Sequence, residues 1–170
     1  MNAAQDITLR LAGPDDIPAI QGLAGRIWRE HYPGIITHAQ IDYMLERMYA
    51  ASVIADEIGN KGYRYVLAMV KGEPVGFLAC VFEPAARSVK LSKLYLLSSL
   101  HGKGIGRKML QQVKDDAVRQ GAKSVYLFVN KRNTKAIASY ERFGMRKAEE
   151  VVTDIGGGFV MDDYRMELAL

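Results

Sequence analysis

A strand-like apolar run followed by closely spaced glycines makes residues 94–107 the part of the chain best suited to bind an anion. Leu94–Leu97 is typical of a buried strand, and apolar residues recur at helical spacing from Ile105 to Ala117. The first N–H groups of a helix lack intrahelical acceptors, and glycine lets an anion approach them closely. The segment between, His101 to Arg107, therefore predicts a phosphate site. A glycine-rich turn without a ligand is the alternative interpretation.

Two common phosphate-binding motifs do not match this segment. A Walker loop requires Lys-Ser or Lys-Thr after its glycines, and neither pair follows Gly106. A dinucleotide-binding fingerprint requires Gly-x-Gly-x-x-Gly near the start of a βαβ unit. Here the spacing is Gly102-x-Gly104-x-Gly106, and it comes after more than half of the chain.

A second motif follows the glycine segment. Asn133-x-x-Ala136-x-x-x-Tyr140-Glu141-Arg142-Phe143-Gly144-Met145 comes after another strand-like run, 124–130. Taken alone, Asn133 indicates a helix cap and Tyr140 a core aromatic. Together, in this order, the two motifs resemble those of the GCN5-related N-acetyltransferase (GNAT) family. His101 replaces the family's Arg or Gln at the start of the glycine motif, and Met145 replaces its final Phe.

The resemblance implies the fold, the co-substrate and the binding residues. The implied fold is α/β, with a mixed, mostly antiparallel central sheet flanked by helices. Acetyl-CoA is the implied co-substrate, with its pantetheine arm along 94–96 and its pyrophosphate on the N–H groups from His101 through Arg107. The cofactor-binding residues expected on this basis are Leu94, Tyr95, Leu96, His101, Gly102, Lys103, Gly104, Ile105, Gly106, Arg107, Asn133, Lys135 and Tyr140.

The implied reaction is direct attack of a primary amine on the thioester, which requires an acid and a base. Tyr140 matches the family's tyrosine that protonates the departing thiolate, and a phenol can donate to that more acidic group. Many relatives carry a carboxylate on the strand before the glycine turn, but this strand has none. Glu83, Glu30, His31 and a water chain are the substitutes we considered. Each named residue is also consistent with a solvated surface group.

The acceptor is predicted from the first two helices and the last hairpin. These contribute four large apolar or aromatic side chains, Trp28, Tyr32, Tyr43 and Met44, and four acids, Glu30, Asp154, Asp162 and Asp163. Aromatic and acidic walls suit a cation, so a small-molecule amine such as a polyamine is expected. A protein N-terminus or lysine side chain is the competing acceptor. The sequence is equally consistent with aromatics that form core and acids that lie on the surface, and both interpretations stay open.

Composition narrows the class of protein. The 170 residues are 49% hydrophobic, which predicts a single domain over 1–170 with its own core. Residues 90–147 hold 14 Lys and Arg against 3 Asp and Glu. Since no nucleic-acid motif accompanies this basic region, coenzyme A phosphates account for part of it and no nucleic-acid partner is expected. A non-catalytic acyl-CoA-binding module and a nucleic-acid binder remain the alternatives.

The cellular setting is predicted from segments that the sequence lacks. No signal peptide, membrane span or metal site is expected, and a lone Cys80 in a strand-like run fits a reducing cytoplasm. The resemblance also implies that a homodimer could form through sheet edges or the last strands.

Hydrophobic periodicity predicts the elements that position these motifs. Helices are expected from Asp15 or Asp16 to Pro33, from Thr37 to Met48 and over 52–58, followed by a helix from the glycine turn to Gly121 and another over 133–142. Strands are expected over 7–11, 63–70, 74–82, 89–97, 124–129, 145–152 and 159–168.

Overall fold

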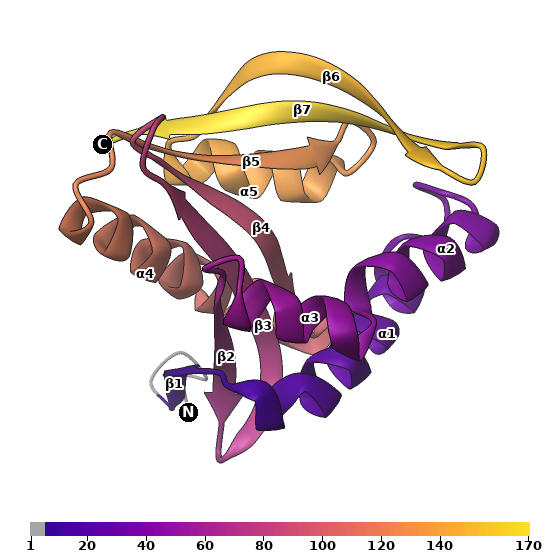
Figure 1. Cartoon of the computed structure of the whole chain (residues 1–170), viewed down its shortest axis with the longest axis horizontal. Helices are drawn as coiled ribbons and strands as arrows, with labels where there is room; N and C mark the ends of the chain where they lie inside the picture. The colour runs from indigo at the N-terminus through magenta and orange to yellow at the C-terminus, as the bar shows by residue number, and fades with distance from the viewer. Residues whose placement is uncertain (1–5) are drawn as a thin grey trace.

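One seven-stranded sheet forms the centre of the computed structural model, which describes residues 6–170 (Figure 1). The spatial order is β1-β2-β3-β4-β5-β7-β6, and every neighbouring pair is antiparallel except β4 and β5. The strands are β1 (Ile7–Leu11), β2 (Arg64–Val70), β3 (Glu73–Glu83), β4 (Ser88–Leu96), β5 (Ser124–Asn130), β6 (Arg146–Gly156) and β7 (Phe159–Ala169).

Helices cover both faces of the sheet and divide the core into two clusters. One cluster joins the sheet to α1 (Ile17–His31), α2 (His38–Tyr49) and α3 (Ala51–Gly59). The other joins it to α4 (Ile105–Arg119) and α5 (Thr134–Phe143). Short 3-10 turns, η1 (Pro14–Asp16) and η2 (Ser98–Leu100), precede α1 and follow β4. The apolar stripe of each helix faces the sheet, which explains why the helical periodicity was readable in the sequence.

The predicted fold class is confirmed, and so is the predicted order of elements. Helix α2 begins where expected because the Thr37 hydroxyl oxygen accepts a hydrogen bond from the Gln40 N–H at 3.1 Å. Observed strand ends differ from the predicted ones by up to four residues, the most at the end of β6, since hydrogen-bond pairing rather than hydropathy sets them. The expectation of a single domain over 1–170 stays a prediction, and residues 1–5 lie outside the described part.

The two central strands pair only at their starts. Parallel pairing of β4 with β5 covers three positions and ends at Lys90 opposite Tyr126. In β4, Leu91 pairs with Cys80 and Lys93 with Ala79, so Ser92 is an extra residue that forms a bulge. A bulge bends its strand, which here accompanies the divergence from β5. Residues 91–96 of β4 and 127–130 of β5 do not pair with each other. We call these two segments the β4–β5 fork.

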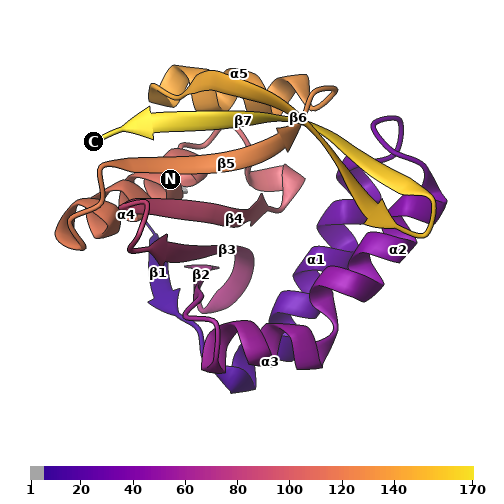
Figure 2. The same cartoon turned by 45° about the horizontal axis from the view of Figure 1, so that its top comes forward.

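The β6–β7 hairpin extends past the sheet toward α2 (Figure 2). Its tip lies against Tyr43, whose hydroxyl group donates to the Ile155 carbonyl oxygen at 2.7 Å. Gly157 has a φ of +62°, and a Cβ there would lie 2.8 Å from the Tyr43 ring. The tip therefore requires glycine both for its backbone conformation and for its close approach to α2.

Candidate active site

Backbone groups of β4 face the fork without a strand partner. The Leu97 N–H donates to the Val75 carbonyl oxygen at 3.0 Å, which belongs to the β3 side of β4. Amide groups alternate along an antiparallel pair, so Tyr95 also faces β3 while Leu94 and Leu96 face the opposite edge. Because pairing with β5 ends at Lys90, that edge can receive the amides of an extended ligand.

Six successive N–H groups follow at the glycine turn. Gly102 and Gly104 have φ values of +74° and +80°, which turn the chain into α4. The first hydrogen bond of the helix runs from the Lys108 N–H to the Gly104 carbonyl oxygen at 3.1 Å. Within residues 6–170, the N–H groups from Gly102 through Arg107 have no acceptor. Such a row at a helix N-terminus matches the oxygens of a pyrophosphate.

His101 occupies the turn differently from the expectation. Its N–H donates to the Ser98 carbonyl oxygen at 3.1 Å because η2 closes a 3-10 turn there. The predicted row of phosphate donors is corrected accordingly and begins at Gly102. The imidazole Nε2 lies 2.9 Å from the Leu96 carbonyl oxygen, and this contact requires the proton on Nε2. His101 thus ties the turn to the end of β4.

Asn133 connects the start of α5 to the end of α1. Its side chain is buried, and Oδ1 lies 3.1 Å from Nε2 of His31. Burial lowers the pKa of His31, and the hydrogen bond to the Asn133 oxygen opposes this shift only in part. His31 is therefore neutral at physiological pH and holds α1 against α5 beside the fork.

Two phenols meet beside the fork, and a third lies on α5. The hydroxyl of Tyr32, which caps the end of α1, lies 3.3 Å from the Tyr95 hydroxyl of β4. Burial raises the pKa of Tyr140 on α5, and Tyr32 raises it further. Burial also raises the pKa of Tyr95, and Tyr32 and Tyr140 add to that shift. Each phenol stays protonated at neutral pH and can donate a proton.

Several of the residues expected to bind the acceptor amine have other positions in the structure. Trp28 and Met44 are fully buried in the α1–α3 core, and Tyr43 binds the hairpin tip. Asp154 accepts a hydrogen bond from the Gly156 N–H at 2.8 Å within the same hairpin. These side chains therefore build the scaffold. Tyr32, Asp162 and Asp163 remain near the end of β5.

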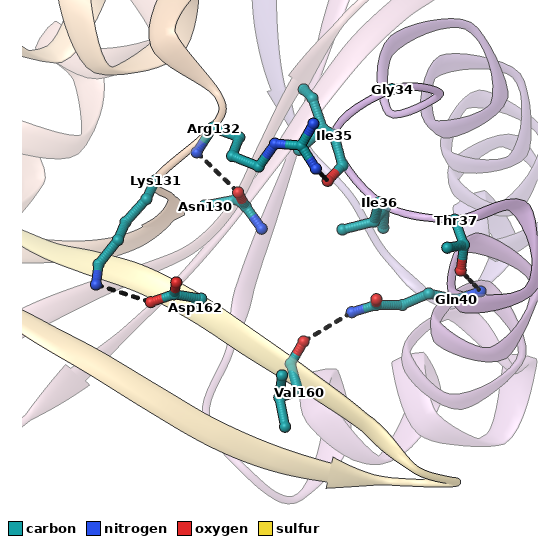
Figure 3. A pocket seen from close by; sticks show the side chains of 10 residues that line it. All are labelled: Gly34, Ile35, Ile36, Thr37, Gln40, Asn130, Lys131, Arg132, Val160 and Asp162. Atoms are coloured by element: carbon teal, nitrogen blue, oxygen red, sulfur yellow. Dashed lines mark hydrogen bonds and ion pairs between the residues drawn. The ribbon is translucent and has the colours of Figure 1, made fainter.

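A pocket of about 430 Å³ lies beside the end of β5 (Figure 3). The Lys131 ammonium group binds the Asp162 carboxylate at 2.8 Å, and Gln40 Nε2 donates to the Val160 carbonyl oxygen at 2.9 Å. Arg132 donates to the Ile35 carbonyl oxygen at 3.1 Å. The pocket is lined by Gly34, Ile35, Ile36, Thr37, Gln40, Asn130, Lys131, Arg132, Val160 and Asp162.

A family model described as the acetyltransferase (GNAT) family matches residues 25–145. The chain belongs to the GNAT family. The match includes both motifs, and it agrees with the unpaired β4 edge and the row of free N–H groups described above. This GNAT protein is an N-acetyltransferase, and acetyl-CoA is its co-substrate.

Named relatives cover most of this GNAT chain at low identity. It is 24% identical over 160 residues to spermidine N(1)-acetyltransferase of Thermoplasma acidophilum, with 92% of this chain and 96% of the relative covered. It is 27% identical over 131 residues to an uncharacterized N-acetyltransferase of Mycobacterium tuberculosis, with 77% and 83% covered.

Two solved structures share the fold. The PaiA N-acetyltransferase of Thermoplasma acidophilum, in complex with coenzyme A, gives a TM-score of 0.81 at 21% identity, covering 96% of this chain and 99% of that one. Spermidine N-acetyltransferase from Vibrio cholerae, in complex with CoA and spermine, gives 0.70 at 19% identity, covering 97% and 96%.

Of the two carboxylates expected as bases, Glu83 lies away from the glycine turn and Glu30 lies beside the end of the fork. Glu83 pairs with Ser88 at the start of β4 and accepts a hydrogen bond from the Tyr126 hydroxyl at 2.8 Å. Eight residues separate Ser88 from Leu96, or roughly 26 Å at about 3.3 Å per residue. Glu30 is exposed on α1 and binds Arg26 at 3.1 Å and Ser98 at 3.3 Å. Glu83 therefore lies at the far end of β4 from the glycine turn, too distant to act on a thioester held beside Leu96. Glu30 faces solvent beside η2.

Asp163 was predicted only as one of four acids near the acceptor, but the structure distinguishes it from the other three. It is only 6% exposed, and its Oδ1 has no hydrogen-bond partner within residues 6–170. Burial and the neighbouring Asp162 raise the pKa of Asp163 to about 6, against the opposing effect of Lys131. An acidic residue in an otherwise alternating strand, Phe159–Ala169, was the available signal. The sequence alone could not show which of Asp162 and Asp163 is buried, because adjacent residues of a strand project from opposite faces of the sheet.

The described residues contain no helix long and apolar enough to cross a membrane.

Proposed function

We propose that this acetyltransferase transfers the acetyl group of acetyl-CoA to a primary amine of a small cationic molecule of the polyamine class. The amine attacks the thioester directly while both substrates are bound. The proposal is carried by one observation, the unpaired β4 edge that leads into six free N–H groups. We expect the thioester to lie at the fork, where Tyr32 and Tyr95 meet, and within reach of Tyr140 on α5.

The cofactor is held mainly by backbone groups. Leu94 and Leu96 pair with the pantetheine amides, while the N–H groups of Gly102 through Arg107 bind the pyrophosphate. Lys103, Arg107 and Lys135 are exposed beside the turn and can meet the outer phosphates. Backbone donors tolerate the His101 replacement, since the imidazole supports the turn instead of binding a phosphate.

Tyr140 is the proposed general acid. A phenol that is half-buried on α5 remains protonated until a stronger base forms in front of it. The departing thiolate is that base. The same residue argues against a purely non-catalytic acyl-CoA-binding module, since binding alone does not require a proton donor there.

A small cationic acceptor is favoured over a protein substrate. The pocket beside β5 is bounded by the α1–α2 connection and the β6–β7 hairpin, and it is the size of a small molecule rather than an extended peptide. Similarity to a spermidine acetyltransferase along nearly the whole chain supports the same class of acceptor. A protein N-terminus or lysine remains the alternative acceptor for the same chemistry.

The test is a panel of amines assayed for CoA release with acetyl-CoA. We expect spermidine or a related polyamine to be acetylated, with little turnover of lysine-containing peptides. Tyr140→Phe should lower kcat by about 100-fold or more while acetyl-CoA affinity stays within a few-fold, because only the proton donor is lost. Turnover of peptides alone would reject the polyamine class, and full activity in the phenylalanine variant would reject Tyr140 as the acid.

A further inference from the structure

Asp163 lies on the face of the sheet that α1, α2 and α3 cover. It pairs with Asn130 at the end of β5 and with Val151 of β6. Met161, two residues earlier on β7, packs against the α1–α3 core, so Asp163 projects from the same face. Tyr32 and Tyr95 pack against that core as well, so the same face carries both phenols and the carboxylate.

The Asp163 carboxylate differs from the other buried acid of the described residues in having no cation. Asp116 is 8% exposed and binds Arg119 and, at 3.8 Å, Arg64. Asp163 has no such ion pair, and its Oδ1 is shielded from solvent without a donor. A buried carboxylate that lacks a partner is costly, so its retention indicates a ligand that supplies the missing charge and hydrogen bond.

The charged groups around Asp163 do not fill this role. Lys131, on the neighbouring strand end, binds Asp162 at 2.8 Å and Glu150 at 3.4 Å. Tyr32, at the end of α1, has a hydroxyl group that contacts Tyr95. Asn130 of β5 accepts the Arg132 N–H through its side-chain oxygen, and Val151 of β6 is apolar. None of these last three groups is a cation, whereas an ammonium group from solution would supply both the charge and the hydrogen bond.

We propose that Asp163 is the catalytic base, which binds the acceptor's ammonium group through Oδ1 and takes its proton before the attack. This inference rests on the proposed function and names the group that the sequence could not supply. It also explains how the enzyme acts without a carboxylate on β4 at the fork. Tyr32 lies on the same face as Asp163 and helps to place the acceptor nitrogen.

The protons and bonds of the reaction balance. Asp163 accepts one proton from R–NH₃⁺, and the freed nitrogen lone pair forms the C–N bond to the thioester carbon. The C–S bond breaks with its electron pair on sulfur, and Tyr140 donates its hydroxyl proton there. The second proton lost by the nitrogen restores the Tyr140 hydroxyl through solvent. Asp163 returns its proton to solvent, so each turnover yields an amide, a thiol and one released proton.

The titration of Asp163 suits this role. With its pKa raised to about 6 by burial and by Asp162, the carboxyl group is ionised at neutral pH yet is a stronger base than an exposed aspartate. The rate should therefore fall below pH 6 as Asp163 becomes protonated. Lys131 lowers that limit and Asp162 raises it, so both must be kept in the assay protein.

Asp163→Asn tests the proposal, with Glu149→Gln as the control. Glu149 is an exposed acid of the neighbouring strand β6 that lines neither the pocket nor the fork. We measure kcat and KM for spermidine across pH 5–9, together with spermidine binding to the protein–CoA complex by calorimetry. The same variants are assayed with 2,2,2-trifluoroethylamine, an amine that is already deprotonated at neutral pH.

The expected results separate a base from a structural residue. Asp163→Asn should lower kcat/KM for spermidine by about 100-fold or more and abolish the fall in rate below pH 6, whereas it should slow trifluoroethylamine acetylation much less. Glu149→Gln should change these rates by no more than a few-fold. Equal losses for both amines, or an unchanged acidic limb in Asp163→Asn, would overturn the proposal.

The binding measurement keeps the two proposals distinguishable. If the wild type acetylates no amine, the proposed function fails, and spermidine binding then decides the role of Asp163 by itself. Loss of that binding in Asp163→Asn but not in Glu149→Gln would support an ammonium site at Asp163. Equal affinity in the wild type and both variants, or no spermidine binding to the wild type, would overturn it.

Discussion

At the scale of single residues, Asp163 links the site's chemistry to the stability of the fold. Its carboxyl group is protonated more readily in the folded chain than in the unfolded one, because burial raises its pKa from 3.8 to about 6. This contribution to stability is fully present below about pH 4 and is lost as the pH rises through 6. At neutral pH the ionised carboxylate therefore destabilises the protein without a ligand.

Asp163→Asn should accordingly stabilise the protein at pH 7.5 while it impairs catalysis. We expect a gain on the order of 2 kcal/mol in the free energy of unfolding at pH 7.5, which shrinks toward pH 4. Urea unfolding at several pH values measures it, with Asp162→Asn as the control. A loss of stability at pH 7.5 would show that the carboxylate has a favourable partner in the folded protein.

Residue types alone predicted the cofactor half of the site better than the acceptor half. Glycine spacing and Asn133 belong to local turns, whose geometry depends on neighbours in the sequence. The base depends on which of Glu30, Glu83, Asp162 and Asp163 is buried, and burial is set by strand pairing and helix packing across the whole sheet. For the same reason, residue types left open whether Trp28 and Met44 line the acceptor site or the core, and the structure places both in the core.

At the scale of elements, a buried ion pair joins α3 to β4. The Lys93 ammonium group lies 3.1 Å from Glu57, and its side chain is only 2% exposed. It also lies over the rings of Tyr49, Tyr63 and Tyr65, at 5.4 to 5.8 Å. Burial lowers the pKa of Lys93, and Glu57 opposes this shift. The pair anchors β4 next to the bulge at Ser92.

Glu57→Gln should destabilise the protein by about 3 kcal/mol or more, because it leaves a buried ammonium group unpaired. Lys93→Met added to that variant should recover much of the loss. Asp56→Asn is the control, since its pair with Lys61 is exposed and such pairs contribute about 1 kcal/mol or less. Chemical denaturation of the wild type and the three variants gives these values. A Glu57→Gln loss no larger than that of Asp56→Asn would contradict the assigned anchor.

Element positions were predictable because their signals are local, whereas the fork was not. The stripes of α1 and α4 and the Thr37 cap are readable from residue spacing. The divergence of β4 from β5 follows from the bulge at Ser92 and from pairing that stops at Lys90. The bulge and the end of the pairing leave no pattern in the sequence of β4, so residue spacing did not predict the fork.

At the scale of the whole molecule, the account depends on one continuous binding surface. The β4 edge, the glycine turn and the start of α5 come from segments up to about forty residues apart, and the sheet brings them together around the acetyl-CoA position. The homodimer suggested by the resemblance stays a prediction. The central claim concerns the free N–H groups of Gly102 through Arg107.

Calorimetric titration with acetyl-CoA tests this claim most directly, comparing the wild type with Gly104→Glu and Gly121→Glu. Both glycines have positive φ, +80° and +75°, and open space around an added Cβ, so the two variants carry similar backbone strain and the same charge. Only Gly104 places that charge at the N-terminus of α4. We predict that Gly104→Glu loses acetyl-CoA binding while Gly121→Glu retains it. Equal affinity in all three proteins would contradict the site described here.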